Sequence, residues 1–148
     1  MIYNRTGKDV EQAKEIRAKI QVGETISQEE ADIMERGTIT SNTLNRISQK
    51  QAELKALLDE NGYFCGAVSV RDWNYSDVFR LADFENLIAN LTTLRTAFFA
   101  LRKTPANPLP KYHFSNINDL EKILFDLESN LDYMIANFPE CGNYECGE

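Results

Sequence analysis

A single histidine limits the chemistry that the side chains of this chain can perform. Nucleophilic mechanisms of the Ser/His/Asp or Cys/His kind use a histidine as general base, so any of them has to use His113. That residue lies between Tyr112 and Phe114, and the chain contains no Gly-x-Ser-x-Gly elbow. A small hydrolase is therefore a third functional hypothesis. It predicts that His113 lies in a deep pocket and bonds a carboxylate or a thiol.

The three cysteines do not follow a metal-binding pattern. Cys141 and Cys146 are too far apart for a zinc knuckle, and neither a second cysteine pair nor a histidine lies near them in the sequence. Either all three, with Cys65, are free thiols that pack as small apolar residues, or Cys141 and Cys146 form a disulfide. The seven glycines form no phosphate-binding loop and no EF-hand. We predict no catalytic residue, no metal site and no cofactor.

The charge balance of the chain disfavours nucleic acid as a partner. Of its 148 residues, 23 are acidic and 16 basic, and the formal net charge is −7. Binding to nucleic acid depends on Lys and Arg that neutralise phosphates. Neighbouring acids such as Glu29 and Glu30 suit solvated helix surfaces and helix starts better than acid–base catalysis. The sequence has no signal-peptide pattern and no apolar run near the ~20 residues of a membrane span. We expect no nucleic acid, membrane or small-molecule partner.

Apolar residues at helical spacing predict an all-α fold in one domain over residues 1–148. The predicted helices cover about 7–20, 28–36, 42–60, 82–102 and 116–138. Capping residues precede the first three helices, and the last is expected to be capped by Asn116. The first two helices form a smaller pair within residues 1–62. The last two form a helical hairpin over 82–138, because short connections make neighbouring helices antiparallel. The result is an irregular bundle of three long helices.

The segments between these helices differ in composition. Residues 63–81 are rich in aromatic and β-branched residues and predict either an extended connector or one short strand. Three prolines, at positions 105, 108 and 110, predict a stiff turn between antiparallel helices. Residues 139–148, in which Glu-Cys-Gly occurs twice, predict a flexible tail.

Two amides interrupt the apolar stripes of the predicted helices. Gln51 occupies a core position of the third helix, and Asn130 a more ambiguous one of the last. Buried amides of this kind can fix the register of packed helices. Alternatively, both side chains face a wet edge of the bundle.

The aromatic residues outside the helices are the candidates for contact with a partner protein, because interfaces are rich in aromatic side chains. Trp73, the only tryptophan, either anchors its loop onto the helices or faces a partner as a binding hot spot. The possible partner-binding residues are Tyr63, Phe64, Trp73, Tyr75 and Tyr144.

Short motifs occur in a characteristic order along the chain. They include Asn4-Arg5-Thr6, Leu44-Asn45-Arg46-Ile47, Asn61-Gly62-Tyr63, Ala82-Asp83-Phe84 and Ile117-Asn118-Asp119-Leu120. From Tyr3 to Glu148, the chain resembles a module of tail-associated structural proteins of phages and prophages of Gram-positive bacteria. The resemblance implies a component of a tail fibre or baseplate that has no enzyme activity. It also implies a location in the virion, after assembly in the host cytoplasm.

The leading hypothesis is therefore a non-enzymatic structural or interaction module of a phage or prophage particle. Its partners would be other virion proteins or further copies of itself. The main alternative is a cytoplasmic adaptor or regulator, phage-encoded or bacterial, that binds another protein. A gene among tail genes favours the first hypothesis, and a gene beside a toxin or repressor favours the second.

Overall fold

The computed structural model describes residues 1–97 and 104–137, and all regular structure in this part of the chain is helical. Its helices are α1 (Gly7–Gln21), α2 (Gln28–Gly37), α3 (Ser41–Glu60), α4 (Leu81–Thr96) and α5 (Phe114–Asn137). The prediction of an all-α fold is confirmed. The end of the predicted fourth helix, from residue 98 on, lies outside the described residues.

Capping boxes begin the first two helices, as the sequence predicts. The backbone N–H of Asp9 donates to Thr6 Oγ1 at 3.3 Å, and the Asp9 carboxylate accepts from the backbone N–H of Thr6 at 2.7 Å. Ser27 and Glu30 form the same pair of bonds at the start of α2, at 3.2 and 3.0 Å.

The predicted cap of the last helix is wrong. Helix α5 begins at Phe114, and His113 Nδ1 accepts a hydrogen bond from the backbone N–H of Ser115 at 3.3 Å. The Asn116 side chain instead donates to the carbonyl of Lys111 at 3.0 Å. The helix starts earlier because the loop turns at residues 111–113, where the N–H of His113 donates to the carbonyl of Lys111.

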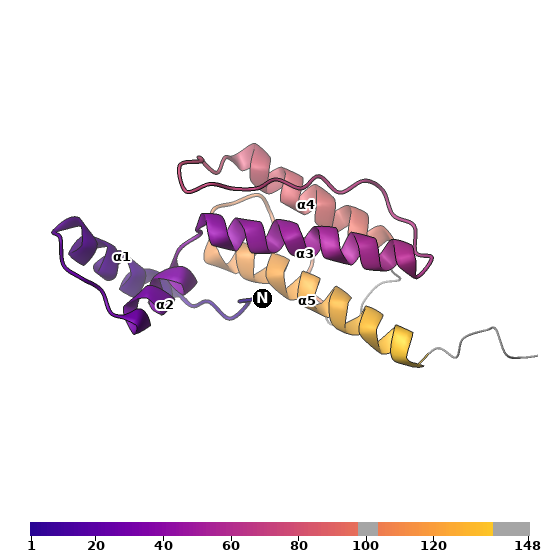
Figure 1. Ribbon diagram of the computed structural model, residues 1–148, viewed down its shortest axis with the longest axis horizontal. Helices are drawn as coiled ribbons and strands as arrows, with labels where there is room; N and C mark the ends of the chain where they lie inside the picture. Colours follow the sequence, from indigo (N-terminus) through magenta and orange to yellow (C-terminus); the bar gives the residue numbers. More distant parts are fainter. Residues whose placement is uncertain (98–103, 138–148) are drawn as a thin grey trace, which may run out of the picture.

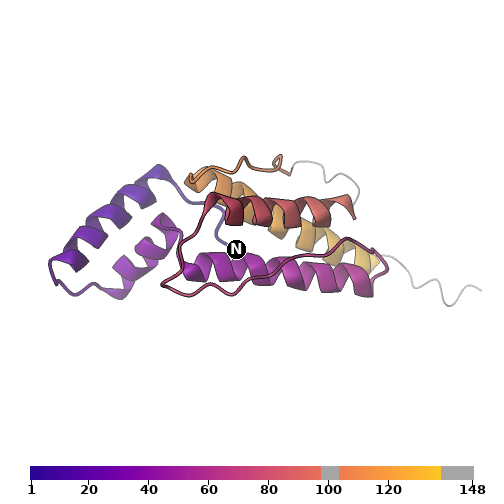
Figure 2. The same cartoon turned by 90° about the horizontal axis from the view of Figure 1, so that it is seen from above.

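The three long helices run in the same direction (Figures 1 and 2). Arg46 and Lys50 of α3 pair with Glu121 and Glu128 of α5 in the same order along both helices. Gln51, in the middle of α3, donates to the carbonyl of residue 87, in the middle of α4. The predicted helical hairpin over 82–138 is therefore wrong, because α4 and α5 are parallel.

The segment between α4 and α5 explains this error. Arg95 donates to the carbonyl of Pro105 at 2.9 Å, and Tyr112 donates to the carbonyl of Phe79 at 3.3 Å. Residues 104–112 therefore return along α4 instead of making a tight turn. The 16 residues of α4 span about 24 Å, and about eight residues of extended chain cover that distance. The connection was long enough to return, so it did not impose an antiparallel arrangement.

The connector of residues 63–80 returns in the same way along α3 and α4, without forming a strand. The Asn90 side chain bonds both the N–H and the carbonyl of Ser69, at 3.0 and 2.7 Å. The Asn45 side chain bonds the N–H and the carbonyl of Trp73, at 2.7 and 2.9 Å. In a sheet, a neighbouring strand would bond these backbone N–H and carbonyl groups. Here the side-chain amides of two helix residues, Asn45 and Asn90, bond them instead.

One core lies between α3, α4, α5 and the connector. Its fully buried members are mostly leucines and isoleucines, and they include Phe84. Trp73 is only 5% exposed and packs edge-on against Phe79 at a centroid distance of 5.5 Å, which confirms that it anchors the connector. Gln51 lies inside this core, whereas Asn130 is exposed and donates to a carbonyl of its own helix. Only Gln51 remains a candidate for fixing the register of the bundle.

Helices α1 and α2 form a hairpin at the end of the bundle where α3 begins (Figures 1 and 2). The two helices pack closely at Gly37. A Cβ atom there would lie 2.2 Å from the carbonyl oxygen of Asp9 and 2.4 Å from the Cβ of Ala13. The close contact therefore requires glycine at this position.

Candidate interaction site at the hairpin end

Buried charges fasten the hairpin and the N-terminal segment to the bundle. The Glu121 carboxylate is fully buried, pairs with the Arg5 guanidinium and accepts from Arg46 Nε at 3.0 Å. Arg46 also pairs with Glu35 of α2 at 3.0 Å. A buried charge is costly unless it is paired and hydrogen-bonded. These contacts therefore hold α2, α3, α5 and the N-terminal segment in one arrangement.

The first hollow at this end is mainly apolar and has a volume of about 450 Å³. It lies between the α2–α3 linker and the tip of the connector, and its apolar wall includes Met34, Ile39, Leu44 and Phe79. Tyr75 also borders the hollow and is 96% exposed. We call this site the apolar hollow. It offers a preformed recess for an apolar side chain beside an exposed aromatic ring.

The second hollow has a volume of about 550 Å³ and also a mainly apolar wall, but most of its charged lining residues are basic. Lys14 and Arg17 of α1, Arg36 of α2 and the buried Arg5 line it, and among the described residues Glu11 is the one acid in its wall. The start of α5, the positive end of that helix dipole, also lines it. We call this site the basic hollow.

The two hollows adjoin each other. They share Arg17, Thr38 and Ile39 as lining residues. Within the described part of the chain, no acid forms an ion pair with Lys14, Arg17 or Arg36. A ligand that covers the shared wall therefore meets an apolar surface on one side and free cations on the other.

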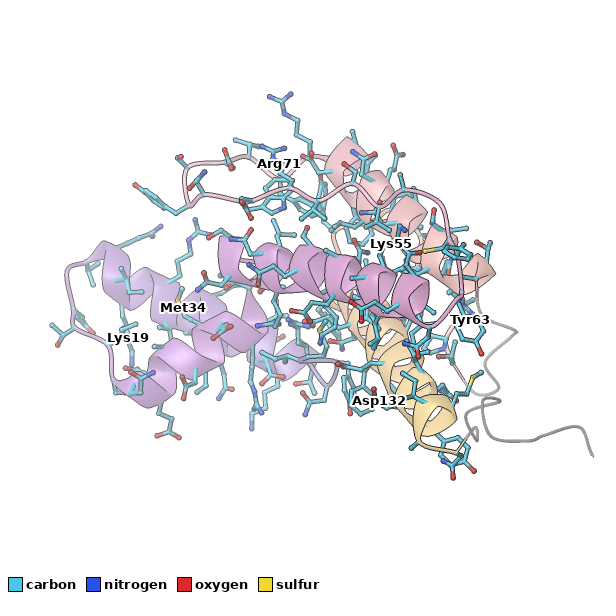
Figure 3. The ribbon with its side chains drawn as sticks, turned by 45° about the vertical axis from the view of Figure 1, so that its right-hand side comes forward. Lys19, Met34, Lys55, Tyr63, Arg71 and Asp132 are labelled. Atoms are coloured by element: carbon cyan, nitrogen blue, oxygen red, sulfur yellow. The ribbon has the colours of Figure 1, made fainter. Side chains whose placement is uncertain are left out.

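The structure separates the partner-binding residues that the sequence predicts. Tyr75 and Phe64 are 96% and 84% exposed, but they lie at opposite ends of the connector. Tyr63 is half-buried, and Figure 3 shows it near the end of α3. Arg71 lies further along the connector, towards the start of α4. The buried Trp73 does not present its ring to a partner, so the hot-spot interpretation of this residue is wrong. Tyr144 lies outside the described residues.

Sequence reasoning missed the basic hollow. The spacing of Lys14 and Arg17 places both on one side of a helix, and that signal was available. The position of Arg36 opposite them depends on the close packing of α1 on α2 at Gly37. The start of α5 joins the site only because the segment before it returns along α4. Neither fact is visible in the spacing of residues.

The residues considered for catalysis are not assembled into a site. His113 is exposed, its Nδ1 lies 2.6 Å from Ser115 Oγ, and its ring has no carboxylate or thiol partner in the described part of the chain. The hydrolase hypothesis required such a partner. In residues 1–97 and 104–137, no three His, Cys, Asp or Glu side chains gather closely enough to hold a metal ion. Burial raises the pKa of the Cys65 thiol above its usual value. Cys141 and Cys146 lie outside the described residues.

No protein-family model matches this chain. No curated protein and no solved structure matches it either. None of the described helices is both long and apolar enough to cross a membrane.

Proposed function

We propose that this chain is a non-enzymatic structural and interaction module of a phage or prophage particle, associated with its tail. It contacts a neighbouring protein through the hairpin end. The observation that carries this proposal is the apolar hollow beside the exposed Tyr75. The assignment to a phage particle is supported by the order of the sequence motifs alone.

The surface around the apolar hollow has the features of a protein-binding site. Interfaces place aromatic and Arg side chains around an apolar centre that becomes desolvated on binding. Here Tyr75 and Arg17 border such a centre, and Val78 nearby is 69% exposed.

The connector that carries Tyr75 is held in place before any partner binds. The Arg71 guanidinium lies over the Trp73 ring at 4.0 Å from its centroid, and it pairs with Asp83 at 3.0 Å. Together with the bonds from Asn45, these contacts fix the backbone next to Tyr75. A fixed surface loses little conformational entropy on binding, which favours affinity.

Mass spectrometry of purified particles from the host tests the proposal. We expect the chain in a constant ratio to the tail proteins across preparations. Particles that never contain it would overturn the assignment to the virion. If the chain is instead found in the cytoplasm in a defined complex with a non-virion protein, the adaptor alternative replaces it.

Two matched variants test the proposed surface. Tyr75 and Phe64 are both exposed aromatic residues of the same connector, and only Tyr75 borders the apolar hollow. We expect Tyr75→Ala to weaken incorporation into particles by about 5- to 30-fold, the effect of ~1–2 kcal/mol at an interface. Phe64→Ala should change it little. Equal effects of the two substitutions would contradict this choice of surface.

A further inference from the structure

We propose that the two hollows bind residues 138–148 of a second copy of this chain, so that copies associate head to tail. This inference rests on the proposed function and names the partner of the hairpin end.

The exposed cations of the basic hollow favour an acidic ligand. Lys14, Arg17 and Arg36 have no ion-pair partner in the described ranges, although the whole chain carries an excess of acids. Arg5 lines the same hollow, and its buried Nε and Nη2 atoms have no hydrogen-bond partner among the described residues. Asp9 lies near Arg36, but its carboxylate is engaged by Thr6. Carboxylates of a ligand would offset this surplus of positive charge.

The apolar hollow adds a second requirement. Because the hollows share Arg17, Thr38 and Ile39, one ligand that fills both carries apolar and acidic side chains close together. Residues 138–148 have the sequence Phe-Pro-Glu-Cys-Gly-Asn-Tyr-Glu-Cys-Gly-Glu. This segment contains two aromatic residues, three glutamates and no Lys or Arg. Its composition therefore matches both hollows.

The length of α5 indicates that the segment comes from another copy. The basic hollow lies at the start of α5, and residue 138 follows its other end (Figure 1). The 24 residues of α5 span about 36 Å. A fully extended segment of 11 residues reaches at most about 36–40 Å, which leaves no residues to occupy the hollows. A second copy meets no such limit. Unless two copies exchange their segments reciprocally, each contact leaves one pair of hollows and one segment free, so association can continue.

Light scattering of the full chain at low ionic strength, over a range of concentrations, tests the inference. The wild-type chain should associate as concentration rises, into dimers or larger species, and added salt should reverse this because screening weakens exposed charge pairs. A hollow variant, Arg17→Glu/Arg36→Glu, and a segment variant, Glu140→Gln/Glu145→Gln/Glu148→Gln, should each lose association by at least ~10-fold, equal to ~1.4 kcal/mol. The control Lys8→Glu/Arg80→Glu makes the same charge change at exposed positions outside both hollow walls and should associate like the wild type.

Mixing the two defective variants gives the sharper result. The segment variant keeps intact hollows, and the hollow variant keeps an intact segment, so a 1:1 mixture should form a dimer and stop there. A mixture that stays monomeric, or a wild-type chain that stays monomeric at high concentration, would overturn the inference. Circular dichroism melting of each variant checks that it folds. If copies do not associate but Tyr75→Ala still impairs incorporation into particles, the proposed function stands and only this inference fails.

Discussion

The buried carboxylate of Glu121 offers a direct test of how the hairpin end is held. It pairs with Arg5 and Arg46, and its side chain is fully buried. Replacing Glu121 with Gln keeps the size and shape of the side chain but removes the negative charge. Two guanidinium groups then lose their shared anion, and one of them, that of Arg5, is itself almost completely buried.

The expected loss of stability follows from this burial. Removing one partner of a buried ion pair costs about 3–5 kcal/mol because the other charge stays buried and uncompensated. Arg46 is 27% exposed at its side chain and keeps Glu35 as a partner, so most of the cost comes from Arg5. We therefore expect the free energy of unfolding to fall by about 3 kcal/mol. At this chain length, that corresponds to a lower Tm by about 6–12 °C.

Urea unfolding and thermal melting of Glu121→Gln measure this effect, and Glu128→Gln is the matched control. Glu128 lies on the same helix, pairs with Lys50 of α3 at 2.8 Å, and has a side chain that is 36% exposed. A pair of this exposure contributes at most about 1 kcal/mol. If Glu121→Gln costs no more than Glu128→Gln, the buried charges do not hold the hairpin end in place.

Three further predictions test the fold. Gly37→Ala should lower the free energy of unfolding by about 1–3 kcal/mol in urea titrations, because the added Cβ overlaps the backbone of α1, whereas Gly7→Ala, which adds its Cβ to open space, should not. Asn90→Ala should cost about 1–3 kcal/mol in the same assay, since it leaves the buried Gln51 amide oxygen without its partner and removes both bonds to the backbone of Ser69, while Asn130→Ala on the surface should be nearly neutral. Hydrogen bonds from the Thr6 side chain and backbone lower the pKa of Asp9 below its usual 3.8. The contribution of this cap to the free energy of unfolding is fully present well above pH 3.8. It is lost as the pH falls through the lower pKa that Asp9 has in the folded protein. In pH-dependent unfolding experiments, the difference between wild type and Asp9→Asn should therefore begin to shrink near about pH 5 and continue to shrink as the pH falls below 3.8.

Local features of the fold could be predicted from the sequence. The capping boxes at Thr6 and Ser27 fix two helix starts, and helical spacing identifies the buried face of each long helix. The anchoring of Trp73 follows from the large apolar area that an indole buries.

The direction of the helices could not be predicted in the same way. It depends on whether residues 104–113 turn sharply or return along α4, and both paths are compatible with three prolines. The return is stabilised by bonds between distant residues, such as Arg95 to Asn107 at 2.7 Å. The hollows form at the meeting point of α1, α2, the connector and the start of α5, so they depend on this choice of path.

Photocrosslinking in purified particles shows whether the hairpin end is the end of the molecule that contacts other proteins. A photoreactive amino acid replaces Tyr75 in one variant and Phe64 in another, and mass spectrometry identifies any crosslinked partner. We predict an adduct with a defined particle protein, or with a second copy of the chain, from position 75 and none from position 64. Adducts from position 64 alone, or from neither position, would contradict the account.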